Sequence, residues 1–303
     1  MRILVLGGAG FLGSALVVEL RKRNHDVTVT SRRDTWSMPT EQTIAWDATE
    51  QWLGSTPPVD AIVHLVGPNG DELSDADPSL SSAKTKNVID LCRRVPQCSL
   101  LYFSTFQVFG RWSGIVTDET IPNPRSAYAV SHMQNESLVR EFGESQHRPV
   151  LVLRPTNIYG VSPNQSAIRW HRVPADFCRQ AVTRREIVIK GSPGDFRDFL
   201  PVSVLARRVA DLLSYREQWD GSCRIVGSGI GVSLSLMAHK VARAAHAVLG
   251  GEVSVQTELS IPSTERMLEV TGRRWQNLTL VSSTGVDFDA PIQELLRVSL
   301  GSS

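Results

Sequence analysis

The sequence contains no long hydrophobic run and has almost no net charge. No stretch of the 303 residues approaches the roughly 20 uninterrupted apolar residues of a membrane-spanning helix, which excludes such a helix. The 32 basic and 31 acidic residues give a formal charge of +1, so we expect neither nucleic acid nor an anionic membrane as a partner. Lysine is especially scarce, with arginine supplying most of the positive charge.

Cysteine is also scarce, and its spacing is not that of a metal site. The four cysteines form no CxxC pair and have no histidine at zinc spacing, so we expect no metal site and no disulfide framework. The hydrophobic share of 41% and the charged share of 21% are those of a folded globular protein. The chain opens on the apolar run MRILVL with no charged leader or cleavage site. These features predict a reduced, soluble, cytoplasmic protein.

The length fits one large α/β domain or two lobes that share a boundary. Short β-branched runs alternate with helical patterns in the first half, which is typical of a parallel sheet covered by helices. After Gly160, glycine and proline separate shorter elements. We therefore predict a Rossmann-like doubly wound parallel sheet in residues 1–159. A smaller α/β substrate-binding lobe, partly intertwined with the first, is predicted in residues 160–303.

A glycine-rich segment lies between the first predicted strand and the first helix. Gly7, Gly10 and Gly13 have the spacing GxxGxxG, with Phe11 and Leu12 between the last two. Glycine permits a tight turn and close approach of the backbone to a pyrophosphate, whose charge the helix N-terminus stabilises. The strand before the loop and the helix after it are the context this motif requires. Gly7, Gly10, Phe11 and Leu12 are the predicted dinucleotide contacts.

The end of the second predicted strand bears on the choice of cofactor. Where an acidic residue would bind the ribose hydroxyls of NAD, the chain has Ser31 followed by Arg32 and Arg33. Two guanidinium groups suit the 2′-phosphate of NADP, although they could also be ordinary surface residues and Asp34 could reach a ribose. Asp47 is a candidate contact for the adenine amino group or a turn residue. We predict NADP as the cofactor.

A tyrosine, a histidine and a threonine form the candidate catalytic set. Tyr128 and His132 are four residues apart on a helical pattern and so share one face. Thr105 follows a predicted strand, at the carboxyl end where α/β proteins bind ligands. Taken alone, these residues establish no activity.

Together with the glycine loop, these segments resemble the extended short-chain dehydrogenase/reductase family. The resemblance is strongest to its nucleotide-sugar epimerases, dehydratases and ketoreductases. The matching segments are GGAGFLG, DAIVHLV, STFQVFG, YAVSH with a later glutamate, RPTNIYG and RDFLPV, in the order in which the family has them.

The resemblance implies a role for each matching residue. Thr105 stands at the catalytic Ser/Thr position and Tyr128 at the position of the proton donor. Leu65 lies at the nicotinamide end of the cofactor site. Asn157 contacts the sugar nucleotide, and Arg197 anchors its diphosphate. The helix that carries the tyrosine commonly forms a dimer interface in this family, so the resemblance makes a homodimer possible.

His132 departs from the family pattern, which has a lysine at this position. In the family that lysine holds the nicotinamide ribose and lowers the pKa of the tyrosine. A neutral imidazole could donate one hydrogen bond to the ribose, and a cationic one could partly replace lysine. Alternatively, the site has lost catalysis. Ser81, in place of a frequent asparagine, and Gly67 are further departures.

These observations predict an NADPH-dependent reductase of a nucleotide-linked keto-sugar, of the 4-keto-6-deoxyhexose type. Tyr128 would donate the proton, while Thr105 orients the same oxygen and His132 holds the ribose. Two alternatives remain open. A nucleotide-sugar 4-epimerase would oxidise and reduce the same carbon on a retained cofactor, and a non-catalytic protein would only bind NADP.

Overall fold

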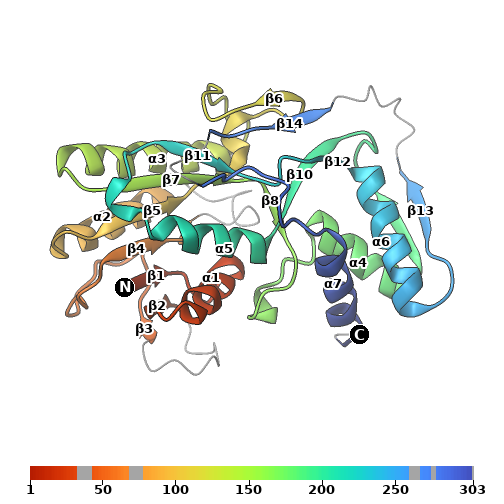
Figure 1. The fold of residues 1–303 in the computed structure, drawn as a ribbon, viewed down its shortest axis with the longest axis horizontal. Helices are drawn as coiled ribbons and strands as arrows, with labels where there is room; N and C mark the ends of the chain where they lie inside the picture. The colour runs from red at the N-terminus through yellow and green to blue at the C-terminus, as the bar shows by residue number, and fades with distance from the viewer. Residues whose placement is uncertain (33–42, 68–77, 259–266, 274–277, 302–303) are drawn as a thin grey trace.

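The computed structural model of the protein describes residues 1–32, 43–67, 78–258, 267–273 and 278–301. Its largest element is a sheet in which all paired strands are parallel (Figure 1). In spatial order its seven strands are β11 (Cys223–Val226), β7 (Val150–Pro155), β5 (Ser99–Phe103), β4 (Ala61–His64), β1 (Arg2–Leu6), β2 (Asp26–Ser31) and β3 (Thr43–Ala45). Strand order reverses between β1 and β4, as in doubly wound α/β folds. The predicted fold class is confirmed.

Helices cover both faces of this sheet (Figure 1). They are α1 (Phe11–Lys22) with α5 (Val202–Leu213) on one face and α2 (Pro78–Arg94) with α3 (Ala127–Ser145) on the other. Successive side chains of β1 alternate between the two cores, because Ile3 and Val5 pack toward α1 and α5 while Leu4 and Leu6 pack toward α2 and α3. Within the described ranges, none of the helices has the length and apolar character needed to cross a membrane.

A second, smaller core lies in the later part of the chain. Its helices are α4 (Val173–Arg184), α6 (Leu234–Leu249) and α7 (Asp289–Gly301). A three-stranded sheet of β8 (Asn157–Tyr159), β10 (Phe196–Pro201) and β12 (Gly231–Ser233) leads into it. The remaining pairs are β9 (Glu186–Ile189) with β13 (Ser254–Thr257) and β6 (Gly114–Val116) with β14 (Leu268–Val270). Short 3-10 helices are η1 (Phe106–Phe109), η2 (Gln165–Ala167) and η3 (Arg216–Gln218).

The later part of the chain also contributes to the large sheet. Strand β11 pairs with β7 at its edge, although it comes after residue 160. Helix α4, which has Pro174 near its start, was not predicted from the sequence. Here the proline lies in the first turn of the helix, where its missing N–H group has no helical partner to lose. The boundary between residues 159 and 160 stays a prediction.

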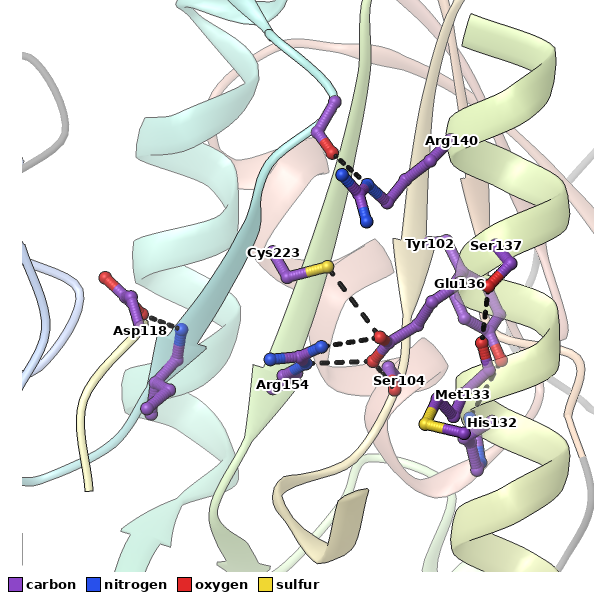
Figure 2. A network of polar contacts seen from close by, with 12 residues as sticks. Tyr102, Ser104, Asp118, His132, Met133, Glu136, Ser137, Arg140, Arg154 and Cys223 are labelled. Atoms are coloured by element: carbon purple, nitrogen blue, oxygen red, sulfur yellow. Dashed lines mark hydrogen bonds and ion pairs between the residues drawn. The ribbon is translucent and has the colours of Figure 1, made fainter. Parts of the chain in front are cut away.

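A buried ion pair joins α3 to the sheet (Figure 2). Arg154 on β7 donates from Nε to Glu136 Oε1 at 2.9 Å and from Nη2 to Oε2 at 2.6 Å. The Ser104 hydroxyl, just after β5, donates to the same Oε1 at 2.5 Å. The two charged side chains are only 6% and 5% exposed. Because this bidentate geometry satisfies both charges away from water, it fixes the position of α3 over β5 and β7.

We predict that Glu136→Gln lowers the free energy of unfolding by about 3–5 kcal/mol, because it leaves the Arg154 charge buried and unpaired. Urea denaturation measures this loss. Asp90→Asn is the control, since Asp90 pairs with Arg93 at a similar 2.6 Å but with both side chains about half exposed. The control should lose less than about 1 kcal/mol. Equal losses for the two variants would contradict the structural role given to the buried pair.

Candidate active site

The glycine loop closes tightly between β1 and α1. Gly7 has a φ of +80°, and the Gly10 N–H group donates to its carbonyl oxygen at 3.0 Å. A Cβ atom on Gly13 would lie 2.3 Å from the Gly7 oxygen, so only glycine fits there. Helix α1 begins directly after the loop with no acidic residue in its first turn. The loop therefore presents a helix N-terminus that suits an anion such as a pyrophosphate.

Two adjoining cavities of about 240 and 560 Å³ lie along this loop. We call the smaller one the tyrosine cavity, because Tyr128 lines it, and the larger one the arginine cavity, because Arg32 lines it. Both are bordered by Gly7, Gly10, Phe11, Leu65, Gly67, Ile168 and Arg169. Their shared wall is the carboxyl edge of the sheet at the β1–β4 reversal, where doubly wound proteins bind ligands. The cavities thus form one continuous site.

Most residues predicted from the sequence line this site. Those in the tyrosine cavity are Gly7, Gly10, Phe11, Leu12, Leu65, Thr105, Tyr128, His132 and Asn157. Ser31, Arg32 and Asp47 line the arginine cavity. Arg33 lies outside the described residues. Among the described residues, no cluster of three or more His, Cys, Asp or Glu side chains could hold a metal ion.

Tyr128 and His132 are brought together by the first turns of α3. Ser126 caps the helix by accepting a hydrogen bond from the Ala129 N–H group at 3.2 Å. The rings of Tyr128 and His132 lie edge to face, with their centroids 4.6 Å apart. Thr105 faces them from the end of β5, and its side-chain oxygen accepts from the Gln107 N–H group at 3.2 Å. That bond leaves the Thr105 hydroxyl proton for another acceptor.

His132 is buried at the inner end of the tyrosine cavity. Its Nδ1 atom lies 2.8 Å from the hydroxyl of Tyr102 on β5, and the residue is 4% exposed. Burial lowers the pKa of His132 to about 3, so the imidazole is neutral at physiological pH. Of the two roles considered from the sequence, the structure favours the neutral hydrogen-bonding group over the cationic replacement for lysine.

Asp47 belongs to a turn as well as to the arginine cavity. Its Oδ1 atom accepts from the Thr49 N–H group at 2.9 Å. Burial alone would raise the pKa of Asp47, but the hydrogen bonds from Thr49 and the charges of Arg32 and Lys84 lower it. Arg32 and Lys84 therefore make this end of the site electropositive. Lys84 was not identified from the sequence.

The structure does not bring the Arg197 guanidinium into the tyrosine cavity. It stacks on Trp112, with 4.5 Å to the ring centroid, and donates to the Phe196 carbonyl oxygen at 2.8 Å. Trp112 lines the cavity in its place. Arg197, predicted from the sequence to anchor the diphosphate, thus packs against an aromatic ring of the cavity wall and does not line the cavity.

Two other arginines, Arg169 and Arg172, do line the tyrosine cavity. They belong to the segment RWHR just before the proline that opens α4. A basic cluster at a helix start is the signal in the sequence that marks these two arginines, which were not predicted as site residues. The residues just before this segment are tied to the glycine loop by two hydrogen bonds. Asn164 Nδ2 donates to the Ala9 carbonyl oxygen at 2.7 Å, and the Ser162 hydroxyl donates to the Phe11 carbonyl oxygen at 2.8 Å.

Asn157 lies where β8 enters the smaller core. Its side-chain Nδ2 atom donates to the Asp198 carbonyl oxygen at 3.0 Å, which fixes the amide against β10. The Asp198 carboxylate is itself buried and accepts from the Thr156 hydroxyl at 2.8 Å. Asn157 is thus held in place on the cavity wall opposite the glycine loop.

Comparison with known proteins agrees with this geometry. The sequence profile of the NAD dependent epimerase/dehydratase family matches residues 3–218. The chain belongs to this family. The resemblance recognised in the sequence is therefore confirmed, and the family's nucleotide-sugar enzymes are relatives of this protein.

Named relatives include both reductases and epimerases. The chain is 28% identical over 257 residues to the GDP-6-deoxy-D-mannose reductase of Pseudomonas aeruginosa, covering 80% of this chain and 79% of that protein. It is 25% identical over 240 residues to a putative UDP-glucose 4-epimerase of Methanocaldococcus jannaschii, covering 75% and 77%. The solved structure of RMD from P. aeruginosa complexed with NADPH matches 99% of both chains with a TM-score of 0.78 and 23% identity.

We predict that two buried histidines make this epimerase/dehydratase family member less stable in acid. Burial lowers the pKa values of His64 and His132 to about 3, while an unfolded chain has values near 6.5. Below pH 6.5 the unfolded state therefore binds more protons, and the free energy of unfolding falls with pH by up to about 1.4 kcal/mol per unit for each histidine. Urea denaturation between pH 7 and pH 5 measures this slope.

The variants His64→Gln and His132→Gln should each remove one histidine's share of that slope. His239→Gln is the control, because it removes an exposed imidazole on α6. A slope that stays unchanged in both buried variants would contradict the assignment.

Proposed function

We propose that this protein is an NADPH-dependent reductase of a nucleotide-linked keto-sugar, of the 4-keto-6-deoxyhexose type. The observation that carries the proposal is the gathering of Thr105, Tyr128 and His132 on one cavity that continues along the glycine loop. The relative named a GDP-6-deoxy-D-mannose reductase supports the choice of reaction, and the NADPH bound in the P. aeruginosa structure supports the choice of cofactor.

The residues along the cleft fit a nicotinamide dinucleotide. The narrow glycine loop and the N-terminus of α1 would hold the pyrophosphate. Arg32 and Lys84 would bind the 2′-phosphate in the arginine cavity, with Arg33 as a further predicted contact. Leu65 and His132 would contact the nicotinamide riboside in the tyrosine cavity. When bound, this cofactor supplies the hydride.

The tyrosine cavity offers cationic and polar groups to the substrate. Arg169 and Arg172 would bind the anionic diphosphate, and the fixed amide of Asn157 would bind the sugar nucleotide. Arg197, predicted as a diphosphate anchor, would instead support the wall of the cavity through Trp112. The positive charges of Arg169 and Arg172 suit a nucleotide-linked sugar better than a neutral substrate.

The catalytic groups would act on one oxygen atom of the substrate. Tyr128 would donate its proton to the carbonyl oxygen as the hydride reaches the carbon, which gives an alcohol. Thr105 would donate a hydrogen bond to the same oxygen and orient it. His132, neutral and held by Tyr102, would bind the ribose beside them.

We expect purified protein to consume NADPH in stoichiometric amounts with a nucleotide-linked 4-keto-sugar, and Tyr128→Phe to lower kcat by about a hundredfold to ten-thousandfold. Loss of a general acid acts on the transition state, so KM should change little. Absorbance of NADPH and analysis of the sugar product measure both. Tyr215→Phe removes a hydroxyl outside the cavity and should retain activity. Conversion of the sugar with no net NADPH use would instead identify an epimerase. If the sugar is not converted at all, the result would favour a non-catalytic protein that only binds NADP.

We further expect NADPH to bind at least tenfold more tightly than NADH, a difference of about 1.4 kcal/mol. Replacing both Arg32 and Arg33 with alanine should remove this preference and leave the affinity for NADH nearly unchanged, because NADH has no 2′-phosphate. Lys84→Ala should reduce the preference in part. Titration calorimetry measures the dissociation constants, and Arg179→Ala on the surface of α4 serves as the control. Equal affinities of the unmodified protein for the two cofactors would disprove the assignment.

A further inference from the structure

A chain of buried polar side chains leads from α2 to His132. The Asn135 amide Nδ2 donates to the Ser81 hydroxyl oxygen at 2.8 Å, and Asn135 also lies near enough to the Tyr102 phenol to lower its pKa. The Tyr102 hydroxyl in turn lies 2.8 Å from His132 Nδ1. All four residues are at most 6% exposed. Figure 2 shows Tyr102 beside His132, behind the Glu136–Arg154 pair.

The phenol of Tyr102 keeps its proton in this environment. Burial raises the pKa of Tyr102 well above its ordinary value, and the nearby charge of Glu136 adds to that effect. The Asn135 amide opposes this rise, and its Oδ1 atom has no hydrogen-bond partner among the described residues, so it does not accept the Tyr102 proton. The one proton of the hydroxyl group is then left for His132 Nδ1.

A neutral imidazole carries its proton on one of its two nitrogens. His132 Nε2 has no hydrogen-bond partner among the described residues. Gly67 lies against this edge of the ring, since a Cβ atom on Gly67 would be 3.3 Å from Cε1 and 3.7 Å from Nε2. Both Gly67 and His132 line the tyrosine cavity. The unpartnered nitrogen is therefore buried beside Gly67, a residue that borders the proposed nicotinamide site.

We propose that Tyr102 is a positioning residue that sets the tautomer of His132. It donates its hydroxyl proton to Nδ1, so the imidazole carries its own proton on Nε2 and presents an N–H donor next to Gly67. The identification of the acceptor as a ribose hydroxyl of the cofactor rests on the proposed function. The tautomer itself depends only on the contacts inside this chain. In this arrangement a buried neutral donor takes the place of an ammonium group.

The nearby titratable groups do not oppose this proton placement. The His64 ring lies 5.1 Å from the Tyr102 ring, and its Nε2 atom is 3.2 Å from the Thr85 hydroxyl. Burial lowers the pKa of His64 to about 3, so it adds no charge beside Tyr102 at neutral pH. Glu136 is paired with Arg154, and the effect of its charge on Tyr102 is to raise the pKa of the phenol and keep it protonated.

The test is the tautomer of His132 in cofactor-free protein with ¹⁵N-labelled histidine. Long-range ¹H–¹⁵N correlation spectra near pH 6 distinguish protonated from unprotonated ring nitrogens, and His132→Gln assigns the signals of this ring by their loss. We expect Nε2 to be protonated and Nδ1 unprotonated. In Tyr102→Phe the two tautomers should both be populated, while Tyr215→Phe should leave the signals unchanged.

Cofactor binding gives a second measurement. With the two tautomers about equally populated, Tyr102→Phe should weaken NADPH binding about twofold, because roughly half of the protein then lacks the Nε2 donor. Tyr215→Phe should bind NADPH like the unmodified protein.

Either of two spectra would overturn the proposal. One is Nδ1 protonation in the unmodified protein, which decides the question even if Tyr102→Phe fails to fold. The other is an unchanged Nε2-protonated ring in folded Tyr102→Phe. A protein that has the expected tautomer but neither binds NADPH nor reduces a keto-sugar would refute the proposed function alone.

Discussion

The site depends on the way α3 is fixed to the central sheet. Glu136 and Arg154 form a bidentate ion pair that is almost fully buried, and Ser104 completes the hydrogen bonds of the carboxylate. A buried charge without its partner is costly, so the pair tolerates little sliding or rotation of the helix. The first turn of α3 therefore meets the carboxyl end of β5 at a defined place, and Tyr128 faces Thr105 across one cavity.

Three residues on one face of α3 have different surroundings. Tyr128, His132 and Glu136 are spaced four residues apart, so they follow one another along the same side of the helix. Tyr128, nearest the helix start, lines the cavity. His132 borders the cavity but is buried, and Glu136 is buried against the sheet, where it pairs with Arg154. Tyr128 is partly exposed, whereas His132 and Glu136 are each 4% exposed, so the row leads from the cavity into the protein interior.

Burial also bears on the proposed replacement of a lysine by His132. An ammonium at this depth would need a countercharge, and the carboxylate of Glu136, four residues further along the helix, already pairs with Arg154. An imidazole avoids this requirement because it is neutral when buried and still has one N–H donor. A neighbouring group has to decide which ring nitrogen carries the proton. The Tyr102 hydroxyl is the group that contacts the imidazole, at Nδ1.

The sequence by itself determined the glycine loop, the alternation of strands and helices, and the positions of Thr105, Tyr128 and His132, because these depend on local spacing and on the order of motifs. It did not determine the surroundings of those residues. The depressed pKa of His132 and the stacking of Arg197 on Trp112 arise from side chains far apart in the chain. Likewise, Arg169 and Arg172 reach the cavity only because residues 162–164 are tied to the glycine loop. Burial and long-range contacts are properties of packing, so only the tertiary structure could decide them.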